Sequence, residues 1–249
     1  MPPPTRIVCA YVMTHDSGHA PNPFHNVCTL AICTPNHKRS RSQPGDWIIG
    51  LAGAGIRQKL GEENTWRLLY AMNVDRTLDL DSYYRDPQFA VKMPRPGASM
   101  EESRGDNFYC KDASGRLRHT RATEEHQAQP PGTGIEKQDM DGDRVFVARH
   151  FWYFGRNAPS LPHGQQWAER LIDKFDTVAV GLRHVYDEGA EIGGRWSDAD
   201  LRAFIDWLPE AQGVLGIPTH WPDAQDELQC TSSCGRIREK CSSDCRERA

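Results

Sequence analysis

Short apolar segments rich in β-branched and aromatic residues fill the first third of the chain, and they constrain its fold most. They are Arg6–Thr14, Val27–Cys33, Trp47–Leu51 and Arg67–Val74, and residues typical of turns follow each of them. This pattern predicts buried β-strands that are separated by loops. Because no helical pattern alternates with these strands, the order does not predict a doubly wound parallel sheet.

The second half of the chain adds further strands and the clearest helix. Strands are expected over Arg144–Phe154 and Thr177–His184. Ser197–Leu208 has apolar residues at helical spacing, begins with a capping serine and is stopped by Pro209. The order of elements predicts an α+β fold, with a bent or barrel-like mixed β-sheet and peripheral helices.

Three connecting segments complete this outline. Gly53–Glu63 is a glycine-punctuated connection, and Lys111–Asp143 is expected to be a mobile surface loop because it has few apolar residues. Between them, Asp79–Arg85 is expected to start a short helix, with Asp79 or Asp81 as its cap, that ends at Asp86-Pro87.

The composition excludes several classes of protein. With 249 residues and 38% hydrophobic residues, the chain is long and apolar enough to bury a sizeable core. Its formal net charge of −4 is not that of a strongly basic nucleic-acid-binding protein. The sequence has neither a membrane-spanning apolar run nor a secretory signal, so we expect a cytoplasmic protein with reduced thiols and no membrane partner.

A polar loop between the first two predicted strands is the strongest candidate for a binding site. His15–Asn26 contains three His, one Asp and two Asn residues among Gly and Pro. Asp16, Asn22 and Asn26 can hydrogen-bond to the edges of a nucleobase, and Phe24 can stack on its face. The alternative is a turn whose Asp and Asn side chains satisfy their own backbone.

Three residues outside this loop complete the predicted base-binding set. Trp47 offers a second aromatic ring, and Asp106 and Asn107 follow Gly105 just before an aromatic pair. For Asp106 and Asn107 the alternative is a turn that faces solvent.

The same region offers groups that could catalyse a reaction. His15 and Asp16 are adjacent, as a general acid–base pair would be, and Cys33 ends a strand beside a basic loop that could lower the pKa of its thiol. A buried and inert Cys33 is the alternative. Metal binding by His15, His19 and His25 is a further alternative, although their spacing does not match a common zinc motif.

A cysteine-rich tail, residues 223–249, follows the single α+β domain that we expect over residues 1–222. Cys230, Cys234, Cys241 and Cys245 form two pairs at helical i, i+4 spacing. They could bind zinc as a cofactor and make the tail an interaction module. Oxidised cross-links and an unstructured tail are the alternatives.

An ordered set of motifs resembles a known family. The motifs are Tyr11–Phe24, Cys28–Pro35, Gly45–Gly50, Gly105–Tyr109, Phe151–Gly155 and the segment Trp207–Trp221. Over roughly residues 6–222 they resemble the nucleotide modification associated domain family. The resemblance implies a place in bacterial and phage systems, phage defence included, that make or handle hypermodified nucleobases. It implies no particular reaction.

A second resemblance concerns the fold. Gly45–Gly50 followed by Arg67–Phe89 is similar to small barrels of the PUA and ASCH type, which hold a modified or flipped base in a pocket. The sequence thus leaves three hypotheses: a protein that binds a modified base, nucleotide or nucleic acid; an enzyme that acts on one; and a zinc-stabilised interaction module.

Overall fold

The computed structural model describes residues 5–33, 40–120, 139–175, 182–188 and 195–221. Contacts between Cα atoms divide the chain into two units, Met1–Thr219 and His220–Ala249. Of the second unit, only His220 and Trp221 belong to the described residues. All that follows concerns the first unit.

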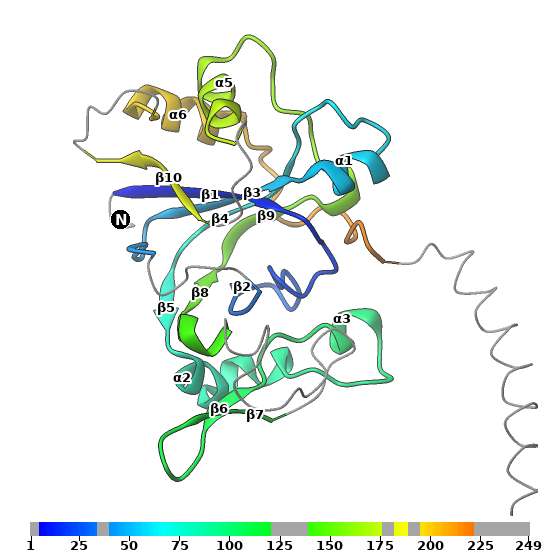
Figure 1. Ribbon diagram of the computed structural model, residues 1–249, viewed down its shortest axis with the longest axis vertical. Coiled ribbons are helices and arrows are strands. Elements are labelled where there is room, and N and C mark those ends of the chain that lie inside the picture. Colours follow the sequence, from blue (N-terminus) through cyan, green and yellow to red (C-terminus); the bar gives the residue numbers. More distant parts are fainter. Residues whose placement is uncertain (1–4, 34–39, 121–138, 176–181, 189–194, 222–249) are drawn as a thin grey trace, which may run out of the picture. The chain divides into compact units, whose positions relative to one another are not determined.

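The described strands form one large sheet and two small ones (Figure 1). Strands β1 and β3 pair in parallel at the centre of the large sheet and are buried almost throughout, which explains their continuous apolar sequences. The six strands of the large sheet are, in spatial order, β10 (Arg183–Asp187), β1 (Ile7–Met13), β3 (Trp47–Ala52), β4 (Leu68–Asn73), β9 (His150–Tyr153) and β11 (Gly213–Val214).

Two neighbouring strands of the large sheet bend and continue into a second sheet. β4 leads into β5 (Arg76–Leu78), and β9 is preceded by β8 (Val145–Ala148), which pairs with β5 and with β2 (Cys28–Leu30). The expected single strand over Arg144–Phe154 is therefore wrong, because the chain changes sheets at Arg149. The α+β fold is confirmed, but the sheets do not close into a barrel.

The helices are short and differ in how well the sequence predicted them. The predicted caps are confirmed, since Asp79 and Ser197 accept hydrogen bonds from the first turns of α2 and α6. Helices α1, α3 and α5 were not predicted, and α1 lies within Gly53–Glu63, which was expected to be a glycine-punctuated connection. None of the described helices has the length and apolar character needed to cross a membrane. The helical segments are α1 (Ala54–Lys59), α2 (Leu80–Arg85), η2 (Pro87–Lys92), α3 (Met100–Ser103), η3 (Gly155–Asn157), α5 (Gln166–Asp173) and α6 (Asp198–Trp207).

Two predicted boundaries are corrected. Part of the expected surface loop forms a hairpin, the third sheet, with strands β6 (Tyr109–Lys111) and β7 (Leu117–His119). The late strand β10 begins at Arg183, whereas it was expected over Thr177–His184, and residues 177–181 lie outside the described part of the chain.

The core consists of two clusters. In the larger one, α5 and α6 cover one face of the large sheet, where the Phe204 ring lies edge-on to Trp47 of β3 and to Trp167 of α5 (Figure 1). The smaller cluster lies under α2 and η2 and includes Tyr83, Phe89 and Phe108. The His15–Asn26 loop contacts residues of both clusters, because Ala20 packs against each of them.

Candidate functional site

A tight turn at the end of the His15–Asn26 loop forms the centre of the candidate site. Asn22 and Thr29 exchange backbone hydrogen bonds of 2.8 and 2.9 Å, so the chain between them is a hairpin. At its tip, His25 and Asn26 both have a φ of 59°. Two successive positive φ angles are what a type I′ turn requires, and neither residue is the glycine that adopts them without strain. Strain of this kind is typical of loops that bind ligands.

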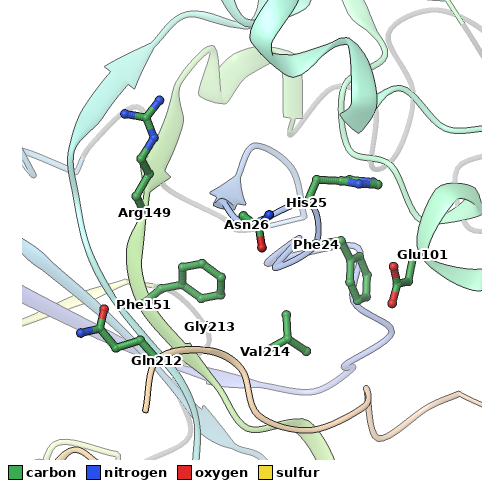
Figure 2. A pocket seen from close by; sticks show the side chains of 9 residues that line it. All are labelled: Phe24, His25, Asn26, Glu101, Arg149, Phe151, Gln212, Gly213 and Val214. Carbon is green, nitrogen blue, oxygen red and sulfur yellow. The ribbon is translucent and has the colours of Figure 1, made fainter. Parts of the chain in front are cut away.

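A hollow of about 550 Å³ opens beside this turn, and we call it the large hollow (Figure 2). The nearly buried rings of Phe24 and Phe151 lie on opposite sides of the space, and the amide of Asn26 lies between them. Its volume falls within the usual range of small-molecule sites. The lining residues are Phe24, His25, Asn26, Glu101, Arg149, Phe151, Gln212, Gly213 and Val214.

A second hollow of about 310 Å³, the small hollow, adjoins the first. The two hollows share His25, Asn26 and Arg149, so they are neighbours around the tip of the turn. The residues that line only the small hollow are Val27, Asp75, Arg76, Gln88, Phe89 and Val147.

Arg149 occupies the bend between β8 and β9, at the boundary of the two hollows. Its backbone N–H donates to Asp75 Oδ2 at 2.5 Å, where the change of sheet interrupts the ladder. Among the described residues, its guanidinium makes one hydrogen bond, a long one of 3.4 Å to Gln88 Oε1. Within the described part of the chain, this side chain has no ion-pair partner, so its donors are available to a ligand.

A fully buried lysine holds the hairpin from beneath. Lys92 Nζ donates to the backbone oxygen of Asn22 at 2.9 Å, to Asn22 Oδ1 at 2.7 Å and to the backbone oxygen of Val27 at 2.6 Å. These three acceptors match the three donors of an ammonium group. Asn22 in turn donates from Nδ2 to the backbone oxygen of Arg104 at 2.7 Å. These hydrogen bonds hold the hairpin on both sides of its tip, at Asn22 and at Val27.

Asp106 is the buried acid whose charge acts most strongly on the pKa of Lys92. Its carboxylate accepts hydrogen bonds of 2.7 Å from Tyr83 Oη and from Thr29 Oγ1. Burial raises the pKa of Asp106, and the positive charge of Lys92 opposes that rise. Burial lowers the pKa of Lys92 to about 8, and Asp106 opposes that fall. Both residues therefore belong to a buried polar network under the hollows.

We expect Lys92 to make stability depend on pH above neutrality. An unfolded lysine keeps its proton up to pH 10.5, whereas folded Lys92 loses it near about 8. Between these values the unfolded chain binds more protons, so the free energy of unfolding rises with pH, by up to roughly 3 kcal/mol from this group. Urea unfolding of the wild type and of Lys92→Met over this pH range measures the effect, because the difference between their free energies of unfolding should increase with pH.

A difference between the two proteins that stays constant with pH would contradict this expectation. The comparison cancels the other titrating groups, which both proteins share. If the variant does not fold, an NMR titration of the Lys92 side chain in the wild type measures its pKa directly.

Asp16, the predicted acid–base residue, is buried at the start of the loop. Its Oδ1 accepts a hydrogen bond from Tyr153 Oη, and its Oδ2 accepts one of 2.9 Å from the backbone N–H of Thr219. Burial raises the pKa of Asp16, and burial together with the charge of Asp16 raises that of Tyr153. The neighbouring His15 is exposed. Neither Asp16 nor His15 lines either hollow.

Several other predicted site residues are part of the architecture. Trp47 stacks on Trp152 in the larger core cluster, with 5.8 Å between ring centroids. Asn107 is buried, and its Nδ2 donates to the backbone oxygens of Tyr83 and Phe89. Trp47, Asp106 and Asn107 do not line either hollow.

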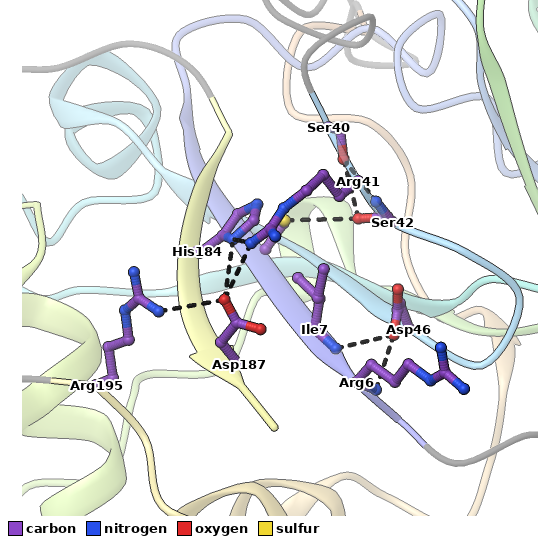
Figure 3. A network of polar contacts seen from close by, with 10 residues as sticks. Arg6, Ile7, Ser40, Arg41, Ser42, Asp46, His184, Asp187 and Arg195 are labelled. Atoms are coloured by element: carbon purple, nitrogen blue, oxygen red, sulfur yellow. Dashed lines mark hydrogen bonds and ion pairs between the residues drawn. The ribbon is translucent and has the colours of Figure 1, made fainter. Parts of the chain in front are cut away.

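The turn before β3 is held by side chains that Figure 3 shows. Asp46 accepts hydrogen bonds of 2.9 Å from the backbone N–H groups of Arg6 and Ile7. Nearby, Arg41 and Arg195 both donate to Asp187 Oδ2. These contacts connect the segment before β3 to the start of β1 and to the edge strand β10.

Cys28, the first residue of β2, and Cys33, which lies beyond the end of that strand, have different surroundings. Cys28 is fully buried, and burial raises the pKa of its thiol to about 12. Cys33 is exposed, has a φ of 59° and donates its backbone N–H to Asp139 Oδ1 at 2.7 Å. One cysteine is thus in the core and the other is exposed, but strand alternation is not the cause, because β2 ends at Leu30, before Cys33. Cys33 does not line either hollow.

The proposed metal ligands fall into two groups. Cys230, Cys234, Cys241 and Cys245 lie outside the described residues. Among the residues that are described, no three His, Cys, Asp or Glu side chains are grouped to hold a metal ion, which contradicts binding by His15, His19 and His25. His19 is buried and stacks on Phe108, with its Nδ1 3.0 Å from the backbone oxygen of Arg104.

The structure thus brings Phe24 and Asn26 of the predicted set to the hollows and adds residues that sequence analysis missed. Arg149 and Lys92 gave no signal, because arginine and lysine side chains are usually solvated. The pair His25-Asn26 did carry one, since His and Asn are among the non-glycine residues that most often adopt positive φ.

Comparison with known proteins agrees with the motifs in the sequence. The family model described as nucleotide modification associated domain 2 matches residues 5–222. No curated protein and no solved structure matches the chain.

Proposed function

Because the chain belongs to the nucleotide modification associated domain 2 family, we propose that its large hollow binds the base of a nucleotide. The nucleotide's phosphate would bind to Arg149. The family associates the chain with nucleotide modification, and the geometry of the hollow supplies the finer proposal.

The observation that carries this proposal is the composition of the large hollow. Phe24 and Phe151 offer rigid apolar walls, and the amide of Asn26 lies between them (Figure 2). A planar base needs apolar surface for its faces and an amide or carboxylate for its donor and acceptor edge. Gln212 and Glu101 offer further polar groups to that edge.

The charged residues that line the large hollow favour one orientation of the bound nucleotide. Arg149 and Glu101 lie at opposite ends of the space (Figure 2). A guanidinium matches the geometry of a phosphate group, and a carboxylate repels it. The phosphate therefore belongs at the Arg149 end and the base toward Glu101. Burial lowers the pKa of His25, which favours a neutral imidazole at the centre of the site.

Replacing Asn26 with glycine separates binding from stability. The change removes the amide that faces the base, so we expect about tenfold weaker binding of a nucleoside monophosphate. It also removes left-handed strain, so the free energy of unfolding should not fall and could rise by about 1 kcal/mol. Calorimetry with natural and hydroxymethylated nucleoside monophosphates measures the first effect, and urea unfolding measures the second. Unchanged affinity with every nucleotide that binds would count against this role of Asn26.

Replacing Arg149 with glutamine tests the phosphate contact. We expect at least tenfold weaker binding of the monophosphate but little change for the nucleoside, because a hydrogen bond to a charged group contributes about 1.5–3 kcal/mol. Arg116→Gln is the matched control, because it removes the same charge from an exposed turn outside both hollows. Equal losses in both variants would reveal a general charge effect. A folded wild type that binds none of these compounds would overturn the proposal.

An enzyme that acts on a nucleotide is the second candidate, and the buried Asp16–Tyr153 pair favours it, although neither residue lines either hollow. A buried carboxyl group of raised pKa, held by a phenol, is typical of acid–base catalysts. Asp16→Asn would then abolish product formation from a bound nucleotide, as mass spectrometry detects, while nucleotide affinity is retained. If wild type forms no product from any nucleotide that it binds, this candidate is excluded.

A further inference from the structure

The small hollow lies beyond the space that a single nucleotide in the large hollow would fill, and a second arginine, Arg76, lines it. From it we infer that the ligand is a polynucleotide strand, whose phosphodiester crosses Arg149 and whose adjoining nucleotide occupies the small hollow. This inference rests on the proposed function, since it takes the large hollow as the site of the first base.

The sizes and positions of the hollows support a strand. The large hollow, at about 550 Å³, has room for a whole nucleotide. The small hollow adds about 310 Å³ and shares His25, Asn26 and Arg149 with it. A chain that leaves the large hollow at Arg149 therefore enters the small hollow directly.

The lining of the small hollow also suits a nucleotide. Phe89, Val27 and Val147 give it apolar walls, and Arg76 gives it a second guanidinium. Proteins that bind single strands combine cations along the backbone with aromatic groups for the bases. Arg149 at the boundary and Arg76 beyond it would contact successive phosphates.

One carboxylate competes with the strand for Arg76. Asp86 Oδ2 lies 3.2 Å from Arg76 Nη2, and the Arg76 side chain is 43% exposed. An exposed ion pair of this kind is weak, so a phosphate can share or replace it. Asp86 also caps η2 by accepting the backbone N–H of Gln88 at 3.0 Å. Asparagine can keep that cap while it releases the cation.

Two variants with opposite expected effects test the inference. The ligands are a nucleoside monophosphate that binds wild type and the dinucleotide that extends it, in deoxyribose and ribose forms that separate DNA from RNA. For wild type we expect the dinucleotide to bind at least fivefold more tightly in one of the two forms. Arg76→Gln should remove this gain, and Asp86→Asn should increase it about threefold. Neither should change the affinity for the monophosphate.

Arg85→Gln is the matched control, because Arg85 of α2 is another exposed, ion-paired arginine and lines neither hollow. If the monophosphate and both dinucleotides bind wild type equally, the inference is overturned while the proposed function stands. Equal effects of Arg76→Gln and Arg85→Gln would also overturn it. If neither the monophosphate nor the dinucleotides bind, the proposed function fails first.

Discussion

Replacing Lys92 with methionine is expected to lower the free energy of unfolding by about 3 to 5 kcal/mol, because it breaks a buried charged network. The ammonium group donates to three acceptors in the hairpin, two on Asn22 and one on Val27. Methionine fills a similar volume but leaves these acceptors without a donor, and it leaves Asp106 without the charge that opposes the rise of its pKa. Chemical unfolding at neutral pH measures the loss.

Two further variants isolate the cause. Lys59→Met removes an exposed lysine and should change stability by no more than about 0.5 kcal/mol. Adding Asp106→Asn to Lys92→Met removes the second buried charge. The double variant should therefore lose less free energy of unfolding than the two single variants lose in sum, by about 1 kcal/mol or more. A fully additive cycle would show that the two charges do not interact. A small loss in Lys92→Met itself would show that the hairpin does not depend on the lysine.

Replacing Gly155 with alanine is expected to lower the free energy of unfolding by roughly 3 kcal/mol. Gly155 follows β9, and its φ is 51°. An added Cβ would lie 2.1 Å from the backbone oxygen of Ile217, which accepts the N–H of Arg156 at 2.8 Å. Backbone on one side or the other must therefore move, and the segment that moves carries Val214 of the large hollow. We expect nucleotide affinity to fall together with stability.

Gly164→Ala is the control for this change. Gly164 also has a positive φ, of 74°, but an added Cβ there meets nothing within 4 Å. It should show only the conformational cost of alanine, about 1 to 2 kcal/mol. The difference between the two variants measures the close approach of the two backbones. Equal losses in both would mean that this approach is not important for stability.

Lys92 and Gly155 both stabilise segments that line the large hollow. Lys92 fixes the hairpin that presents His25 and Asn26, and Gly155 allows the segment around Val214 to close the large hollow. Both supports are contacts between parts of the chain that are far apart in sequence. Neither could be inferred from a local pattern.

Local patterns were informative where a local cause determines the structure. The caps at Asp79 and Ser197 were predictable because a capping side chain bonds to backbone within three residues of it. Strands β1 and β3 were predictable because burial on both faces needs an unbroken apolar run. The break at Arg149 was not predictable, since Arg144–Phe154 keeps strand-like residues through the bend, and only the pairing of β8 with β5 and β2 divides it.

By itself, the sequence determined the α+β class, the main strands, the family and the loop from which the candidate site is built. Short-range physics fixes these features through periodicity, turn residues and caps. The tertiary structure decided which polar residues are buried and stabilise the fold, and which line the hollows where a ligand would bind. Asp16, Asn22 and Asp106 read as exposed recognition groups but are buried, because distant hydroxyls, backbone groups and Lys92 satisfy them. A side chain of the same type is exposed or buried according to partners that the chain supplies from elsewhere, and folding brings those partners together.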